Sequence, residues 1–569
     1  MNKRRIKIVL ILIIAFGLVI ICRLAYLQIL NYDFYRALAK GQQIISYSIT
    51  PNRGDIFAQD RDGGLFLLAT NKNSDFVFIS PSQVKDKEKV VDLLSQSLGL
   101  EEDLISEKVE DDSKSFVVVK KEISEEEKEK VKDYKEDSIH VGSEITRYYP
   151  ENDLAAHTIG FVGGEQRGQY GVENFYEEEL KGEKGVAVGE RSSDGYMIFF
   201  DSDSSLPVQE GSDLVLTIDF YIQYEAEKLL QKAKEELEIE NGQIVVINPK
   251  TGEIKALASL IDFNPNDYSD YELQSFINPV SQSLFEPGSV FKAITMAAAI
   301  EEEEITPETK YVDEGFIKIG PDTIHNYSNR VYGESTMTEV LEKSINTGAV
   351  FAAQKMSPDT FLDYIEKFGV FEKTGIDTQG EVCSENKELK KGYEVNFATA
   401  SFGQGIEMTP IQLIRAFSVF ANGGKLVKPY LVDKIVNSEE VILDNSLEVQ
   451  DQVVSEKTAS EVRDMLVSVV ENGFGKKAKV PGYYVGGKTG TAQVSFSSMG
   501  VNKSGYSEKT IQTFIGFAPA YSPEFIILVK LDNPNTRTAE YSAVPIFREL
   551  AEYVINYYQI PPDYNEEEE

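Results

Sequence analysis

The second half of the chain carries the most regular pattern of apolar and polar positions. A short apolar run at 214–219 is followed by apolar residues at helical spacing over 220–238, which predicts a strand and then an amphipathic helix. Two strand-like runs, 243–248 and 253–259, flank a Pro-Lys-Thr-Gly turn and predict a β-hairpin. Towards the C-terminus the pattern predicts four more strands and a closing helix, at 483–485, 489–496, 511–518, 525–531 and 543–558.

Strands at both ends of this half, with helical patterns between them, predict one antiparallel sheet that carries a mostly helical insertion. Within the insertion, the apolar residues after Pro287 and Gly288 predict a buried helix that begins near Ser289. Residues 46–207 instead show short alternating strands with Gly and Pro turns. The highly charged stretch 101–137 is most simply a solvated surface.

The N-terminus combines a basic tip with a long apolar run. The run spans residues 8–22, and its apolar character continues past Arg23, whose side chain can snorkel. No small-residue cleavage site follows and 31–43 continues as an amphipathic helix, which favours an uncleaved membrane anchor over a signal peptide. Because the basic residues precede the span, the N-terminus is expected in the cytoplasm and the remaining chain outside it.

Composition excludes several classes of function. The formal net charge of −36 argues against nucleic acid as a partner, because a phosphate backbone requires a basic face. Of the two cysteines, Cys22 falls in the apolar run, so no disulfide framework is expected. The histidines are scattered and no Cys/His cluster has metal-ligand spacing, so neither a metal nor another cofactor is expected.

The pattern Ser-x-x-Lys at Ser289 and Lys292 is the first candidate for chemistry. Residues three apart on a helix lie on one face, so the hydroxyl and the amine can approach each other. A lysine can take the proton of a serine only if burial or a cationic neighbour lowers its pKa, and the apolar helix supplies burial. The spacing alone is weak evidence, since Ser82 and Lys85 share it, and there the serine is expected to be the N-cap of a polar helix.

Two further motifs follow in the chain. Ser344-Ile345-Asn346 presents a hydroxyl and a carboxamide from a turn, which could relay a proton and hold an amide. Lys488-Thr489-Gly490-Thr491 begins a strand after two glycines, where a lysine and two hydroxyls at a strand edge suit a carboxylate. Lys-Thr-Gly also occurs at 250–252 and 373–375, where it is expected to form a hairpin turn and a loop.

Taken in order, Ser-x-x-Lys, Ser-x-Asn and Lys-Thr-Gly resemble the signature of penicillin-binding proteins and serine β-lactamases. The likeness extends from the anchor to about Tyr558 and is most specific for class B members, because no glycosyltransferase domain fits before Gly211. The strings EPGSVFK and SINTG are more similar to division-type enzymes than to elongation-type ones. Other similar strings are found at 53–63, 147–150, 157–160, 171–173, 216–219, 400–413 and 487–493.

The resemblance implies a multidomain α/β protein with four parts. These are a cytoplasmic tip and transmembrane anchor at 1–30, a mixed α+β pedestal of the dimerisation type at 31–210, a transpeptidase domain at 211–558 and an acidic tail at 559–569. The transpeptidase domain is expected to contain an antiparallel five-stranded sheet flanked by helices. The end of the tail, 566–569, is expected to be disordered.

The resemblance also implies the catalytic roles. Ser289 attacks the carbonyl between the last two D-alanines of a peptidoglycan stem peptide, and Lys292 takes its proton. Ser344 passes that proton towards the leaving D-alanine, while Asn346 holds the substrate amide. An amine of a neighbouring stem peptide then takes the acyl group, and β-lactams acylate the same serine.

The third motif is assigned to the other end of the substrate. Lys488, Thr489, Gly490 and Thr491 are expected to bind its terminal carboxylate. The backbone amides of Ser289 and Thr491 would form the oxyanion hole, in which each donor is typically worth about 10²–10³ in rate.

Three features depart from the commonest family pattern. Val290 replaces a threonine, which should be harmless because the side chain packs. His325-Asn326-Tyr327 stands where many members carry Asn-Trp, and the chain has no tryptophan. The polar segment 497–510, beyond the strand of the third motif, is expected to be mobile.

Two alternatives to a transpeptidase remain open from the sequence. One is hydrolysis of the same acyl-enzyme, as in a D,D-carboxypeptidase or β-lactamase, against which the anchor and pedestal count. The other is a non-catalytic scaffold of the division machinery, against which the intact motifs count. By family, a membrane-embedded glycan polymerase and other cell-wall or division proteins are the expected partners.

Overall fold

The computed structural model describes residues 3–111, 113–134, 136–191, 197–199, 206–260, 263–437, 441–444, 451–496, 498–503 and 505–564. By packing, the chain divides into two compact units: Met1–Arg53 with Lys181–Gly211, and Gly54–Leu180 with Ser212–Glu569. The second unit contains residues from both sides of residue 210. This division by packing does not test the boundaries predicted after residues 30, 210 and 558, which stay predictions. The predicted disordered end, 566–569, lies outside the described residues.

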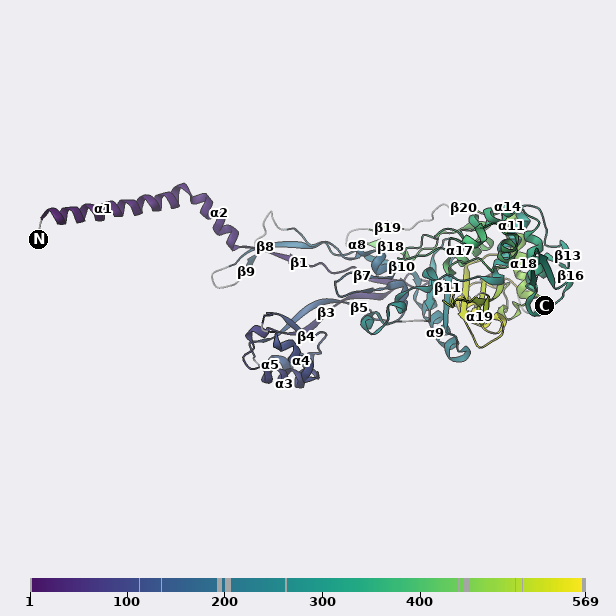
Figure 1. Ribbon diagram of the computed structural model, residues 1–569, viewed down its shortest axis with the longest axis horizontal. Coiled ribbons are helices and arrows are strands. Elements are labelled where there is room, and N and C mark those ends of the chain that lie inside the picture. The colour runs from purple at the N-terminus through teal and green to yellow at the C-terminus, as the bar shows by residue number, and fades with distance from the viewer. Residues whose placement is uncertain are drawn as a thin grey trace. The chain divides into compact units, whose positions relative to one another are not determined.

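The first unit holds the predicted anchor (Figure 1). The helix over Lys3–Leu30 is long and apolar enough to cross a membrane, and no residue of α1 is buried. The predicted amphipathic helix follows it as α2. The elements of this unit are α1 (Lys3–Ala25), a π-helical turn (Tyr26–Leu30), α2 (Tyr32–Gln43) and a sheet in the order β1 (Ile44–Ile49), β8 (Gly185–Arg191), β9 (Met197–Phe199).

A seven-stranded sheet forms one part of the second unit. Its order is β19 (Val441–Asp444), β18 (Val432–Val436), β10 (Asp213–Asp219), β2 (Ile56–Gln59), β3 (Leu65–Ile79) and β4 (Val117–Lys120), with β5 (Ile139–Tyr148) paired to β3. Helices α3 (Lys87–Leu98), α4 (Glu102–Glu110) and α5 (Glu125–Asp133) share a small core with β3 and β4. Short elements lead from β5 towards β10: α6 (Ala156–Ile159), β6 (Phe161–Val162), β7 (Gly168–Gln169), α7 (Gly171–Phe175) and α8 (Glu177–Leu180).

The expected N-cap at Ser82 is wrong. Ser82 lies in the 3-10 turn Pro81–Gln83, and α3 begins five residues later, at Lys87. Its cap is Asp86, whose carboxylate accepts a hydrogen bond from the amide of Lys89 at 3.2 Å. Aspartate is a cap as good as serine, and it stands next to the first helical residue, so it takes the role.

The five-stranded antiparallel sheet that the family resemblance implied is present. Its order is β12 (Ile254–Ser259), β11 (Asn241–Ile247), β23 (Phe525–Asp532), β22 (Tyr506–Ala518), β21 (Gly486–Ser495). The predicted hairpin is β11–β12, so strands from both ends of the domain meet at β11 and β23. Helices α9 (Phe220–Leu237) and α19 (Ala543–Tyr558), both predicted, share a core with one face of this sheet.

The predicted separate strand at 483–485 is wrong, because β21 starts at Gly486 and runs without a break through Gly487. The two glycines do not interrupt the strand. A Cβ at either would lie 2.6 Å from a ring atom of a phenylalanine on the neighbouring strand, Phe517 for Gly486 and Phe514 for Gly487. Glycine is needed here for the close approach of rings from β22.

In the described part of the insertion between β12 and β21, helical residues outnumber strand residues, and the insertion packs on the other sheet face. Its helices are α10 (Pro279–Gln282), α11 (Lys292–Glu301), α12 (Met337–Glu342), α13 (Asn346–Ala353), α14 (Pro358–Lys367), α15 (Lys387–Lys390), α16 (Glu394–Ala400), α17 (Pro410–Ala421) and α18 (Glu456–Glu471). Small two-stranded pairs accompany them: β13 (Lys310–Asp313) with β16 (Gly333–Thr336), β14 (Phe316–Ile319) with β15 (Asp322–His325), and β17 (Lys425–Leu426) with β20 (Asp451–Gln452).

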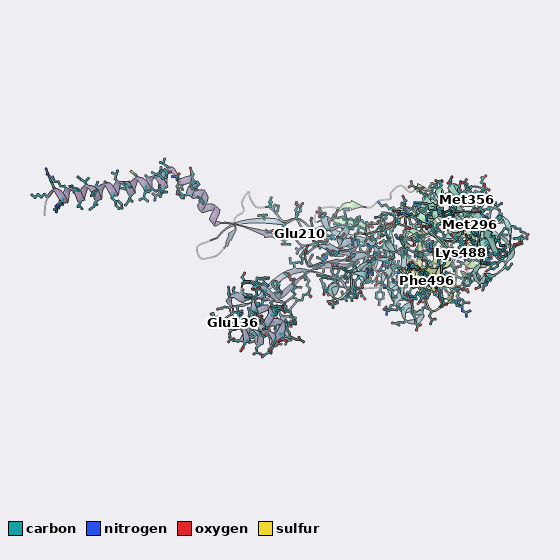
Figure 2. All side chains as sticks on the ribbon, in the orientation of Figure 1. Glu136, Glu210, Met296, Met356, Lys488 and Phe496 are labelled. Carbon is teal, nitrogen blue, oxygen red and sulfur yellow. The ribbon has the colours of Figure 1, made fainter. Side chains whose placement is uncertain are left out.

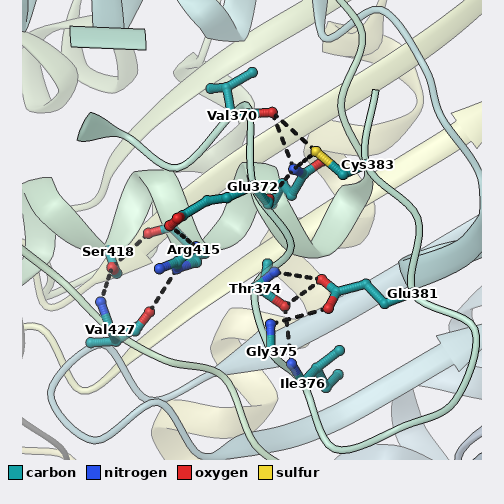
Figure 3. Close-up of polar contacts among 11 residues, drawn as sticks. Val370, Glu372, Thr374, Gly375, Ile376, Glu381, Cys383, Arg415, Ser418 and Val427 are labelled. Atoms are coloured by element: carbon teal, nitrogen blue, oxygen red, sulfur yellow. Dashed lines mark hydrogen bonds and ion pairs between the residues drawn. The ribbon is translucent and has the colours of Figure 1, made fainter. Parts of the chain in front are cut away.

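Both additional Lys-Thr-Gly sequences are structural, as predicted. At 250–252 the motif is the tip of the β11–β12 hairpin, and Gly252 has a φ of +87°. At 373–375 it is a loop held by one carboxylate, as Figure 3 shows. Glu381 accepts hydrogen bonds from the amide and hydroxyl of Thr374, at 2.6 and 2.7 Å, and from the amide of Gly375 at 3.1 Å.

Candidate active site

The nucleophile candidate lies in a tight turn at the start of a buried helix. Gly288–Phe291 is a 3-10 turn and α11 begins at Lys292, so the predicted helix starts one turn later than Ser289. The glycine is required, since Gly288 has a φ of +59° and its amide donates to the carbonyl of Gly403 at 2.9 Å. Ser289 is half-buried, whereas its neighbours Val290 and Phe291 are fully buried.

Lys292 is fully buried and faces the second motif. Its Nζ donates to the carbonyl oxygen of Ser344 at 2.6 Å and to Asn346 Oδ1 at 2.8 Å, and lies 3.2 Å from Ser344 Oγ. Burial lowers the pKa of Lys292 well below its ordinary value, and the charge of Lys488 lowers it further. The amine is therefore poised to accept a proton, although these three acceptors belong to the second motif and not to Ser289.

The second motif is a strained turn between two helices. Ser344 follows α12 with a φ of +53°, a left-handed conformation that costs about 1–2 kcal/mol for a residue with a Cβ. The turn is held by the fully buried Ile345, whose amide donates to the carbonyl of Val340 at 2.9 Å. Asn346 opens α13, and its Nδ2 donates to the carbonyl of His325 at 3.0 Å, which leaves Oδ1 directed at Lys292.

The third motif brings a second buried lysine to the same hydroxyl. Lys488 on β21 is fully buried, and it lies among the packed side chains of its domain (Figure 2). Its Nζ is 3.1 Å from Ser344 Oγ and donates to the carbonyl of Thr489 at 2.9 Å. Burial lowers the pKa of Lys488 to about 7. The structure therefore gathers Lys292, Ser344, Asn346 and Lys488 into one cluster.

Strand β21 lies directly against the turn that carries Ser289. A Cβ at Gly490 would lie 3.1 Å from the carbonyl oxygen of Pro287 and from Cγ1 of Val290, so only glycine permits this approach without a shift. The hydroxyls of the two threonines differ: Thr489 Oγ1 lies 3.4 Å from Lys488 Nζ, whereas Thr491 Oγ1 accepts from the amide of Ala539 at 3.3 Å.

One acidic residue beside the nucleophile was not singled out from the sequence. Glu286 accepts hydrogen bonds from the amide of Gly405 at 3.1 Å and from the hydroxyl of Tyr506 at 3.2 Å. Burial is the main reason that the pKa of Glu286 is raised to about 7. Tyr506 begins β22, so residues 506–510 of the segment predicted to be mobile form strand. A carboxylate next to Pro-Gly-Ser was the only available sequence signal.

The chemistry that this arrangement supports is acyl transfer through a serine. A hydroxyl stands one turn before a lysine of lowered pKa, and a second hydroxyl lies between two lysines. Among the described residues, β21 is an edge strand of its sheet, so an extended ligand can lie along it. A lysine at that edge favours a ligand with a carboxylate.

Comparison with known proteins gives two family matches. Residues 242–552 match the family described as Penicillin binding protein transpeptidase domain, and residues 48–216 match Penicillin-binding Protein dimerisation domain.

Relatives and solved structures extend the likeness over nearly the whole chain. Stage V sporulation protein D of Bacillus subtilis is 34% identical over 94% of this chain and 82% of its own length. The Peptidoglycan D,D-transpeptidase FtsI homolog of Mesostigma viride is 30% identical over 99% and 98%. The crystal structure of Penicillin binding protein 3 from Mycobacterium tuberculosis, complexed with aztreonam, is similar with a TM-score of 0.69, 26% identity and coverage of 91% of this chain and 98% of that one.

Proposed function

Since the chain belongs to the class B penicillin-binding proteins, we propose that Ser289 is the residue at which it is acylated. The chain is a serine-type peptidoglycan D,D-transpeptidase, and it binds peptidoglycan stem peptides and β-lactams. It crosslinks stem peptides through an acyl-enzyme and releases the terminal D-alanine. The assignment of individual residues to these steps is the proposal.

Lys292 is the general base of acylation. In its neutral form the amine keeps two N–H donors for the carbonyl of Ser344 and Oδ1 of Asn346, and one lone pair is left to accept a proton. Ser289 Oγ then attacks the carbonyl carbon of the penultimate D-alanine while its proton passes to Lys292. The observed contacts of Lys292 support this role, because the two shorter ones, to the carbonyl of Ser344 and Oδ1 of Asn346, hold the amine, while the longer one, to Ser344 Oγ at 3.2 Å, gives the accepted proton a route onward.

Ser344 is the proton relay to the leaving group. Its Oγ lies 3.2 Å from Lys292 Nζ and 3.1 Å from Lys488 Nζ. The hydroxyl can therefore take a proton from Lys292 as it gives its own proton to the leaving group. The amide C–N bond breaks, its nitrogen gains that proton, and D-alanine departs. The acyl group stays on Ser289 until an amine of a second stem peptide attacks, with the same groups acting in reverse.

The third motif binds the carboxylate end of the substrate. Lys488, Thr489 and Thr491 line the edge strand, and Gly490 lets that strand approach the turn of Ser289. This approach supports an oxyanion hole made by the backbone amides of Ser289 and Thr491. Each such donor is typically worth about 10²–10³ in rate.

The chain is a single-pass membrane protein, and its orientation is part of the proposal. Lys3, Arg4, Arg5 and Lys7 precede the span, which favours a cytoplasmic N-terminus and an extracytoplasmic catalytic domain. We propose that the protein acts in cell-wall synthesis during division, because it is similar to the FtsI homolog. A membrane glycan polymerase that contacts the anchor and pedestal is the proposed partner, and the boundaries after residues 30, 210 and 558 are the proposed domain limits.

The observation that carries this proposal is that two buried lysines approach Ser344 Oγ and that one of them, Lys292, lies one turn after Ser289. The test is covalent labelling of the full-length protein in membranes with a fluorescent penicillin. Ser289→Ala should abolish labelling, and Ser82→Ala, which alters the same Ser-x-x-Lys spacing elsewhere, should leave it unchanged. Labelling of Ser289→Ala at the wild-type level would refute the assignment.

The same preparation separates the alternatives. Rapid release of hydrolysed penicillin from the labelled protein would indicate a carboxypeptidase or β-lactamase. A Ser289→Ala strain that grows and divides normally would favour a scaffold. The transpeptidase instead retains the label and transfers a stem-peptide acyl group to an added amine.

A further inference from the structure

A buried carboxylate lies behind the second motif, where the strand pairs β13–β16 and β14–β15 meet α13. Asp313, the last residue of β13, is 2% exposed. Its Oδ1 accepts from the amide of Gly315 at 2.9 Å and from the hydroxyl of Thr347 at 2.7 Å. Its Oδ2 accepts from the amide of Tyr332 at 2.7 Å, and both oxygens lie 2.9 Å from Nδ2 of Asn326. All of these donors are uncharged.

Asn326 extends this network to the backbone of α13. The residue is 4% exposed, and its Oδ1 accepts from the amide of Thr347 at 3.1 Å. Asp313 thus binds the side chain of Thr347, and Asn326 binds its backbone. Thr347, 3% exposed, is held at two points by residues that precede it by more than twenty positions.

The residues next to these anchors are the ones that face the catalytic cluster. His325 precedes Asn326 and its carbonyl accepts from Nδ2 of Asn346, while Asn346 itself precedes Thr347. The network therefore fixes both the segment that carries Asn346 and the carbonyl that orients its carboxamide. The orientation matters, because the opposite end of that carboxamide meets Lys292 Nζ at 2.8 Å.

We propose that Asp313, through Asn326 and Thr347, is a positioning residue of the transpeptidase site. It touches neither the substrate nor the reacting atoms, and it acts by holding the Asn346 carboxamide towards Lys292. The inference rests on the proposed role of Lys292 as base and goes beyond the three motifs. A buried carboxylate that accepts five hydrogen bonds from four donor groups defines one arrangement of the two strand pairs, because without it the amides of Gly315 and Tyr332 would lose the acceptor that these contacts give them.

The test uses the time course of acylation of the full-length protein by a fluorescent penicillin. A positioning defect lowers the rate constant at saturating penicillin while every molecule is still labelled in the end. A defect of folding alone lowers the labelled fraction and leaves the rate constant of the remaining molecules unchanged. The two readouts therefore separate positioning from stability.

Asp313→Asn keeps the shape of the side chain but replaces one carboxylate oxygen with an NH₂ group. That group would face the N–H and O–H donors that now bind the carboxylate. The rate constant should fall about tenfold or more, since small misplacements of catalytic groups have effects of this size. Thr347→Val, which removes one donor to Asp313, should lower it as well, and Thr347→Ser should stay within about threefold of wild type. The matched control is Asp322→Asn, on the exposed side of β15.

A wild-type rate constant in both Asp313→Asn and Thr347→Val would overturn the proposal, as would a loss confined to the labelled fraction. Failure of the proposed nucleophile is distinguishable, because Ser289→Ala would then still be labelled whatever happens at Asp313. If Asp313→Asn does not accumulate as folded protein, the comparison of Thr347→Val with Thr347→Ser decides alone.

Discussion

Lys292 and Lys488 approach one hydroxyl from two different elements, with Nζ 3.2 Å and 3.1 Å from Ser344 Oγ. Both lysines are fully buried, so neither ammonium is compensated by water. Two such groups titrate as a pair, and a proton on one makes a proton on the other less favourable. The arrangement thereby keeps one amine free to act as a base while the other can still pair with a carboxylate.

This coupling predicts how the pH dependence changes in Lys488→Met. The charge of Lys488 lowers the pKa of Lys292, so removing it should raise that pKa and move the ascending limb of acylation to higher pH. The difference in rate constant between the variant and the wild type that comes from this charge should be largest below about pH 7, because Lys488 carries its proton there. The measurement is the second-order rate constant for penicillin from pH 5 to 10.

The control is Lys373→Met, in the exposed loop that repeats the Lys-Thr-Gly sequence. Its pH profile should match that of the wild type. If the Lys488→Met protein is acylated more slowly by the same factor at every pH, and the ascending limb of its pH profile does not move, then Lys488 serves only to bind the carboxylate of the ligand.

The left-handed turn at Ser344 predicts a separation of activity from stability. Ser344→Ala and Ser344→Gly both remove the hydroxyl, so both should lose the proton relay and acylate more slowly, by about 10²–10⁴-fold. At a φ of +53° the alanine keeps the strain and glycine does not. Ser344→Gly should therefore unfold with a free energy about 1 kcal/mol higher than Ser344→Ala.

Denaturant unfolding of the two purified variants, followed by circular dichroism, measures this difference. Equal stability would mean that the turn relaxes out of the left-handed conformation when the serine is replaced. Unequal acylation rates would mean that the hydroxyl is not the only function of residue 344.

The contact between β21 and the nucleophile turn predicts the effect of Gly490→Ala. The added methyl group would lie 3.1 Å from the carbonyl oxygen of Pro287 and from Val290, so strand and turn must separate. Such a shift widens the proposed oxyanion hole, and the acylation rate constant should fall by about 10²-fold. Gly164→Ala, whose nearest neighbour is 3.9 Å away, is the matched control and should react as the wild type does. An undiminished rate in Gly490→Ala would place the oxyanion donors elsewhere.

Local patterns predicted much of the fold. The amphipathic helix α9, the β11–β12 hairpin and the closing helix α19 each follow from spacing within one segment. The choice among the three Lys-Thr-Gly sequences was also local, because Lys488 follows two glycines and itself opens a strand, whereas the sequence at 250–252 lies in a hairpin turn. The order of the motifs then identified the family before any contact was known.

Contacts between distant segments were beyond prediction. Lys292 binds Ser344, 52 positions away, and Asp313 binds Thr347, 34 positions away, and no periodicity links either pair. The strand of the third motif was predicted to begin after the glycines at 486 and 487, and it includes them, because the phenylalanine rings that require these glycines come from another strand. Glu286 was passed over for the same reason: its burial depends on Gly405 and Tyr506, which are more than one hundred positions away.

Glu286 supplies a final prediction, on stability against pH. Burial, as the largest cause, raises its pKa from 4.5 to about 7, and the nearby Glu407 adds to the rise. A raised pKa means that the folded protein holds this proton more tightly than the unfolded chain does. The stabilisation is therefore fully present below pH 4.5 and is lost as the pH rises through about 7.

Glu286→Gln does not titrate, so it should be free of this loss. Its free energy of unfolding relative to the wild type should rise by at most about 3.5 kcal/mol between pH 4.5 and pH 8, a ceiling that follows from the rise in pKa from 4.5 to about 7 at about 1.4 kcal/mol per pKa unit. Replacing an exposed carboxylate on α9, as in Glu235→Gln, is the matched control. A relative stability of Glu286→Gln that stays constant across this pH range would mean that the carboxylate beside the nucleophile turn is solvated, and that its bonds to Gly405 and Tyr506 do not hold it in a buried site.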